Sequence, residues 1–178
     1  MNRFENVLGK LSTGRSILIF FTLYLVFVLG LLPILAEHSS GAQVIDLAFH
    51  YSIEEVYAWM ELYGAQGRHR YMLGEMTIDV LYPIIYTCLF CGVLGFLLNF
   101  KQGGQYRWLA TAPFSIWFFD LLENTGIVAM LYNYPEKLEQ VALLTSWATS
   151  IKWSLAATIL TLTIILGVRF LAQKFSSN

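Results

Sequence analysis

The sequence predicts an all-α integral membrane protein, a four-helix bundle with a further helix at the membrane surface between the first and second spans. Of its 178 residues, 57% are hydrophobic and only 13% are charged, and the mean hydropathy is +0.58. A soluble domain has about 45–50% apolar and about 25% charged residues. The apolar residues also fall into four long runs, which is typical of spans rather than of a soluble core.

The four runs predict spans at about residues 16–36, 78–100, 108–132 and 141–168. Each run is long enough to cross a hydrocarbon core of roughly 30 Å as a helix. The first run resembles a signal peptide, with Ser40-Gly41-Ala42 imitating a cleavage site, but its apolar stretch is too long for one. We therefore expect a retained span and a single membrane domain over residues 1–178.

Basic residues predict the orientation of the chain. Four crossings place seven of them on one side of the membrane and only Arg68, Arg70 and Lys137 on the other. The positive-inside rule then puts both termini in the cytoplasm, so we expect a multi-pass protein of the inner membrane. The seven are Arg3, Lys10, Arg15, Lys101, Arg107, Arg169 and Lys174.

The segment between the first two spans predicts a surface helix at about residues 53–63. Ser52 and Glu55 have the spacing of a capping box, apolar residues then recur at helical spacing, and Gly64 is a suitable end. Such a helix would lie on the membrane surface as a lid. Packing against the outer ends of the spans explains the pattern equally well. A second short helix from about Arg68 is expected to lead into the second span, where Pro83 would produce a kink.

Polar side chains form one stripe on each of the last three spans. Residues three, four or seven positions apart share a face of a helix, so each stripe points in one direction. An ionised side chain in mid-membrane costs at least about 2.5–3.5 kcal/mol, so these stripes should face protein or water. The stripes are Asp79, Tyr82 and Tyr86, then Asp120, Glu123 and Asn124, then Thr145, Thr149 and Lys152.

We expect the three stripes to meet in one polar pocket between spans 2, 3 and 4 that opens outward beneath the surface helix. Three carboxyl groups face a single lysine there. Either a carboxyl group is protonated, or Arg68 or Arg70 reaches into the pocket. Simpler interpretations remain open: Asp79 solvated at the interface, Lys152 extended outward to the membrane surface, and the third-span stripe as a purely structural network.

Cys88 and Cys91 form a CxxC pair, but a redox function is not favoured. Membrane thiol oxidoreductases of the quinone-linked type need a second cysteine pair, and this chain has two cysteines in all. Cys88 with Gly92 and Cys91 with Gly95 also fit close helix packing. The spacing of the three histidines, His38, His50 and His69, predicts no metal site. We expect no cofactor, and the net charge of −1 argues against nucleic-acid binding.

Together, these motifs resemble a family of small bacterial four-span membrane proteins that has no assigned activity. The likeness covers about residues 44–153 and implies no reaction. The emopamil-binding and sigma-2-receptor group is similar in architecture alone, since no motif matches it residue by residue. The residues that carry the first resemblance are Gly64, Gly67-Arg68, Asp79-x-x-Tyr82-Pro83-x-x-Tyr86, Asp120-x-x-Glu123-Asn124 and Lys152.

Three functions agree with this pattern. The first is a pocket for a membrane lipid or small amphiphile, with or without acid–base chemistry by Asp120 and Glu123. The second is a small proton- or ion-coupled transporter, in which a homodimer is expected. The third is an assembly or scaffold protein. The cytoplasmic half of the second and third spans is mainly apolar, which favours the pocket over a transport path.

Overall fold

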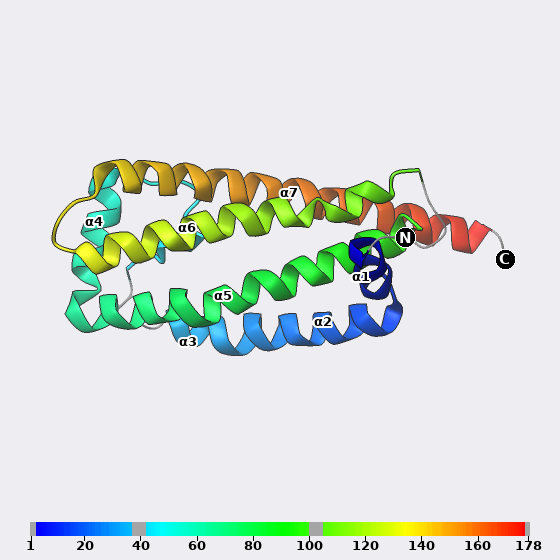
Figure 1. The fold of residues 1–178 in the computed structure, drawn as a ribbon, viewed down its shortest axis with the longest axis horizontal. Helices are drawn as coiled ribbons and strands as arrows, with labels where there is room; N and C mark the ends of the chain where they lie inside the picture. Colours follow the sequence, from blue (N-terminus) through cyan, green and yellow to red (C-terminus); the bar gives the residue numbers. More distant parts are fainter. Residues whose placement is uncertain (1–2, 37–41, 100–104, 177–178) are drawn as a thin grey trace.

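The computed structural model describes residues 3–36, 42–99 and 105–176, which are mostly helical and contain no β-strand. Four helical segments are long and apolar enough to cross a membrane: Gly14–Ile34, Gly64–Leu97, Arg107–Asn133 and Glu139–Ser176. Figure 1 shows them side by side along the long axis of the molecule. The predicted all-α bundle is therefore confirmed. Phe100, Lys101, His38 and the Ser40-Gly41 pair, which entered the sequence predictions, lie outside the described residues.

The chain begins with a short helix that lies across one end of the bundle. This helix, α1 (Arg3–Leu11), buries Leu8. The first span then consists of α2 (Gly14–Val26), the π-helical turn η1 (Phe27–Leu31) and α3 (Leu32–Ala36). Thr13 caps α2 by accepting a hydrogen bond from the backbone N–H of Ser16 at 3.3 Å.

Two glycines of the second span let the N-terminal segment approach closely. A Cβ atom on Gly92 would lie 2.7 Å from the carbonyl oxygen of Leu11, and one on Gly95 would collide with Oγ of Ser12. These are the glycines of the two predicted close-packing pairs, and they contact the N-terminal segment. Close packing here needs no redox role for the neighbouring cysteines.

The segment after the first span contains η3 (Ile45–Leu47), a single 3-10 turn, and α4 (Ile53–Leu62). The capping box of α4 is confirmed, because Ser52 N donates to Glu55 Oε2 at 2.8 Å and Glu55 N donates to Ser52 Oγ at 3.2 Å. Gly64, with φ of +65°, separates α4 from the next helix. Glycine adopts this positive φ without the steric cost that a Cβ atom adds.

Helix α4 packs against the ends of the third and fourth spans. Val56 and Met60 are fully buried in one cluster with Ile127, Met130 and Ala142. Of the two interpretations of the surface helix, the structure therefore favours packing against the ends of the spans.

The remaining spans are long helices. They are α5 (Gly64–Leu97), then η5 (Arg107–Thr111) with α6 (Pro113–Asn133), and α7 (Glu139–Ser176). Helix α5 is unbroken from Gly64 and carries Pro83 in its interior, so the separate short helix expected from Arg68 is wrong. Helix α2 packs on α5, α5 on α6, and α6 on α7, which leaves the first and fourth spans at the two edges of this order.

The capping box gives the stability of α4 a defined pH dependence. Hydrogen bonds from the backbone N–H and the hydroxyl of Ser52 lower the pKa of Glu55 below its usual value. Because the folded-state pKa is the lower one, this contribution is present above the unfolded-state pKa and is lost as pH falls through the folded-state pKa. We expect Ser52→Ala to raise the pKa of Glu55 and to fray the start of α4. An NMR titration of the Glu55 carboxyl carbon measures this.

The matched control is Ser154→Ala, which removes a serine of α7 far from the capping box in the sequence. It should leave the Glu55 titration where it is in the parent protein. An unchanged Glu55 pKa in Ser52→Ala would show that the Ser52 hydroxyl does not hold the carboxylate, because alanine keeps the backbone N–H at position 52.

Candidate functional site

Lys152 of α7 is buried inside the bundle and paired with two carboxylates of α6. Its Nζ lies 3.1 Å from Oδ1 of Asp120 and also contacts Oε2 of Glu123. The exposed fractions are 8% for Lys152, 5% for Asp120 and 0% for Glu123. The interpretation in which Lys152 extends outward to the membrane surface is therefore wrong, because two buried acceptors hold its ammonium group.

Further hydrogen bonds join this ion network to the other polar stripes. Thr149 Oγ1 donates to Glu123 Oε1 at 2.7 Å, and the Tyr86 hydroxyl donates to Asp120 Oδ2 at 3.1 Å. Asn124 Nδ2 donates to the backbone oxygen of Asp79 at 2.9 Å. The stripes of α5, α6 and α7 thus meet, and all four carboxylate oxygens of Asp120 and Glu123 have partners. This arrangement also fits the structural-network interpretation.

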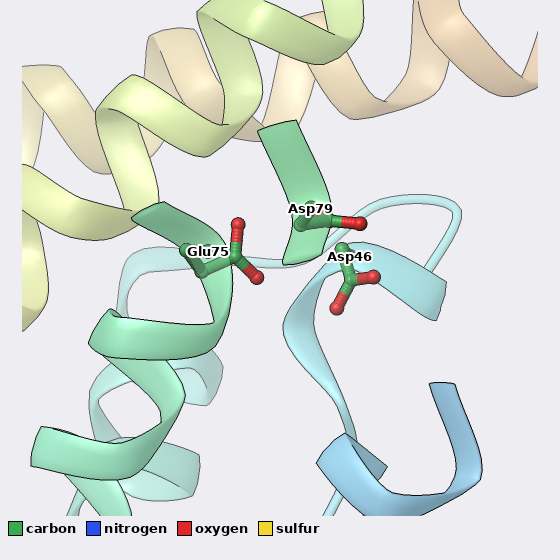
Figure 2. Close-up of side chains that lie close together, drawn as sticks. All are labelled: Asp46, Glu75 and Asp79. Carbon is green, nitrogen blue, oxygen red and sulfur yellow. The ribbon is translucent and has the colours of Figure 1, made fainter. Parts of the chain in front are cut away.

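A second acidic group lies beside the network. Asp46 of η3 and Glu75 and Asp79 of α5 each offer a carboxylate oxygen, and these three atoms lie within 4.8 Å of one another. Figure 2 shows the two side chains of α5 next to Asp46, which comes from a different part of the chain. The Tyr71 hydroxyl donates to Asp46 Oδ1 at 2.5 Å. Among the described residues, no lysine or arginine forms a salt bridge with this group.

Sequence reasoning missed two members of this group. Glu75 and Asp79 are four positions apart, so their shared helical face was readable from the spacing. Glu75 lies just before the predicted start of the second span at about residue 78, so the stripe on that span does not include it. Asp46 had no comparable signal, since it lies in a single 3-10 turn whose position depends on tertiary contacts. The hydrogen bond from its backbone N–H to the Tyr71 hydroxyl, at 3.4 Å, is one of them.

A cavity of about 400 Å³ opens next to these charges. Five residues of the predicted stripes line it: Asp79, Tyr82, Tyr86, Asp120 and Lys152. Asp46 adds a further carboxyl group. The remaining lining is largely apolar and comes from the first span, η3 and all three other spans: Tyr24, Leu32, Leu47, Phe90, Ile116, Trp153, Ala156, Ala157, Ile159 and Leu160.

The position of this cavity corrects the predicted pocket in two ways. Its lining includes the first span, where Tyr82 stacks on Tyr24 with ring centroids 5.9 Å apart. No residue of α4 lines it, so the predicted lid does not cover it. On its exposed side, Leu47 and Leu160 are 57% and 48% exposed. We infer that the cavity opens sideways, on the flank where Leu47 of η3 and Leu160 of α7 are exposed.

Several predicted pocket residues lie elsewhere. Glu123, Asn124 and Thr149 are buried behind the cavity without lining it. Arg68 donates from Nη1 to the carbonyl oxygen of Met60 at 2.8 Å, with its guanidinium 3.8 Å from the ring centroid of Tyr134. Arg70 is exposed. Neither arginine forms a salt bridge with an acidic residue of the described part of the chain. Asp79 is only 7% exposed, which contradicts the interpretation of a solvated carboxylate.

The two cysteines are free thiols outside the cavity lining. Cys91 is fully buried in an apolar cluster with Leu8, Leu94 and Ile116, and Cys88 is half-buried. Soluble thiols reach buried cysteines poorly, so the position of these cysteines does not support a redox function. His50 is hydrogen-bonded to serine side chains of α7, at 3.0 Å from Ser146 Oγ and 3.1 Å from Ser150 Oγ.

The fold and the site together define a class: a helical membrane protein that carries a buried ion network beside a largely apolar cavity. No protein-family model, no curated protein and no solved structure matches this chain.

Proposed function

We propose that this chain is a multi-pass protein of the inner membrane, with both termini in the cytoplasm, that binds a lipid or small amphiphile in the cavity beside Asp79. The observation that carries the proposal is a cavity with an apolar wall and an acidic end. Sites for small molecules are mainly apolar, with a few polar groups that fix orientation, and have volumes of roughly 300–1,000 Å³.

The two parts of the cavity suit the two parts of an amphiphile. Phe90, Ile116 and Leu160 offer an apolar wall for a hydrocarbon chain, and each buried methylene contributes about 0.8 kcal/mol relative to water. At the other end, Asp79 lines the cavity and its carboxylate accepts no hydrogen bond from another described side chain. A head group that donates hydrogen bonds would satisfy it.

The sideways opening suits a ligand that arrives from the membrane. A soluble ligand would need an aqueous route, whereas a lipid reaches the exposed flank of the bundle by diffusing in the bilayer. The exposed Leu47 and Leu160 form part of this flank and are compatible with acyl chains. Acid–base chemistry on the bound molecule would involve Asp79, because both oxygens of Asp120 already have partners.

The transporter alternative receives less support. Figure 1 places α1 and the C-terminal end of α7 at one end of the bundle. We assign that end to the cytoplasm because Lys10 lies in the last turn of α1 and Arg15 in the first turn of α2. Between that end and the ion network, Leu8, Leu94 and Ile116 pack in one buried apolar cluster. A transport path needs polar groups through this layer. A binding site that opens on one flank does not.

Native mass spectrometry of protein extracted from its own membrane tests the binding proposal. We expect a lipid-sized adduct on the parent protein and its loss in Ala157→Phe, which places an aromatic ring at the cavity wall. Ala172→Phe, at an exposed position of the same helix, is the matched control and should keep the adduct. Asp79→Asn should weaken retention of the adduct. Equal adduct occupancy in Ala157→Phe and Ala172→Phe would overturn the proposal.

A further inference from the structure

The carboxylates of Asp46, Glu75 and Asp79 lie beside the cavity and form no salt bridge with Lys152, which donates instead to the backbone oxygen of Asp46 at 3.4 Å. We propose that these three carboxylates bind one hard divalent cation, of the class of Ca²⁺, Mg²⁺ and Mn²⁺. All three donors are oxygen atoms, which hard cations prefer over nitrogen or sulfur ligands. This cation site is distinct from the amphiphile site, although Asp46 and Asp79 belong to both.

The geometry fits a single coordination sphere. Calcium–oxygen distances are about 2.3–2.6 Å, so two ligands on opposite sides of the ion are at most about 5 Å apart. The three carboxylate oxygens lie within 4.8 Å of one another. Glu75 and Asp79 come from successive turns of α5, and Asp46 comes from η3 (Figure 2). Carboxylates can bind with one or both oxygens, which leaves room for water ligands.

Glu75 provides the independent indication of a ligand. Its side chain is 3% exposed, and its Oε2 atom is buried with no hydrogen-bond partner. A buried carboxylate without a partner is costly, because it has lost its water and gained nothing in return. Figure 2 shows its carboxyl group on the side of α5 where Asp46 lies. The nearest paired lysine, Lys152, forms its salt bridges with Asp120 and Glu123 instead.

The placement of Glu75 also favours a small ion over the ammonium head group of an amphiphile. Asp46 and Asp79 line the cavity, but Glu75 does not. A head group inside the cavity would therefore reach two of the three carboxylates and leave Glu75 unpartnered. A metal ion between the three oxygens reaches them all. The hydrogen bond from Tyr71 to Asp46 Oδ1 has the form of the outer contacts that orient metal ligands.

Manganese binding to the full chain in phosphatidylcholine nanodiscs tests this proposal, because Mn²⁺ has the ligand preference of the class and an electron paramagnetic resonance signal that reports the free ion. We expect one saturable Mn²⁺ site per chain, displaced by Ca²⁺ or Mg²⁺. Glu75→Gln should weaken the affinity for Mn²⁺ by about tenfold or more, and Tyr71→Phe by about tenfold. Glu61→Gln, an exposed acid on α4, is the matched control and should bind as the parent does.

Thermal unfolding separates loss of binding from loss of the fold. Mn²⁺ should raise the Tm of the parent protein and of Glu61→Gln, but not that of Glu75→Gln. Should Glu75→Gln not yield folded protein, Asp79→Asn gives the same comparison. Absence of a saturable site in the parent, or equal Mn²⁺ affinity in the parent and the folded variant, overturns the cation proposal.

The cation and amphiphile proposals can fail separately. Glu75→Gln changes a residue outside the cavity lining, so it should lose Mn²⁺ while keeping the lipid-sized adduct. Ala157→Phe changes the cavity wall without altering any of the three carboxylates and should lose the adduct while keeping Mn²⁺. A Glu75→Gln protein that keeps both Mn²⁺ and the lipid-sized adduct contradicts the cation proposal and leaves the amphiphile proposal intact.

Discussion

Replacing Lys152 by methionine is expected to destabilise the bundle by about 3–5 kcal/mol, since it leaves Asp120 and Glu123 buried without their positive partner. Glu123 is fully buried and lies outside the cavity lining, so it has no direct access to water once the ammonium group is removed. Thermal unfolding of detergent-solubilised protein, followed by loss of the monodisperse peak in size-exclusion chromatography, measures the effect. We expect much of the folded protein to be lost.

Two comparisons assign this loss to the unpaired carboxylates. Lys10→Met removes an exposed lysine of α1 and should leave the Tm close to that of the parent. The triple variant Lys152→Met with Asp120→Asn and Glu123→Gln removes both buried negative charges together with the lysine, and should recover much of the lost stability. A Lys152→Met protein as stable as Lys10→Met would show that the ion network does not hold α6 and α7 together.

The second large effect is expected at Gly126, where α6 lies in close contact with Thr145 of α7. A Cβ atom at this position would collide with Oγ1 of Thr145 and lie 3.0 Å from its Cβ and Cγ2 atoms. Thr145 cannot turn away easily, because its β-branched side chain is stiff and its hydroxyl donates to the Val141 carbonyl at 2.7 Å. We therefore expect Gly126→Ala to cost about 1–3 kcal/mol and to lower the Tm.

Gly167→Ala is the control for the general effect of placing alanine in a helix. An added Cβ at Gly167 meets no atom within 4 Å. Because alanine has the higher helix propensity, this variant should be as stable as the parent or more stable by up to about 1 kcal/mol. If Gly126→Ala behaves in the same way, the helices are free to separate slightly at Thr145, and close approach there is not required.

Local rules predicted much of the fold from the sequence. Run length located the four spans, and the Ser52–Glu55 spacing located the start of α4, since both depend on residues that are neighbours in the chain. Helical spacing also indicated that the stripes of α5, α6 and α7 share faces that meet. The sequence did not distinguish pairing of Lys152 with these carboxylates from its extension to the membrane surface, and the structure shows the pairing with Asp120 and Glu123.

Contacts that depend on the path of the irregular segments, or on which helices are neighbours, were not predictable from local sequence rules. Asp46 reaches the site through η3, and nothing in its local sequence indicates that it meets Glu75 and Asp79. The same is true of Arg68, whose bond to the Met60 carbonyl depends on the turn between α4 and α5. The part taken by Tyr24 in the cavity wall depends on which helix the first span packs against, and helical periodicity alone does not specify a neighbour.

The apolar cluster around Leu8, Leu94 and Ile116 has a consequence for membrane energetics. In a membrane that maintains a proton gradient, a chain of buried carboxyl groups that reached both faces would act as a leak. The packed layer between the ion network and the end where α1 lies interrupts such a chain with hydrocarbon. Among the described residues, no continuous chain of carboxyl groups therefore leads from the ion network to that end of the bundle.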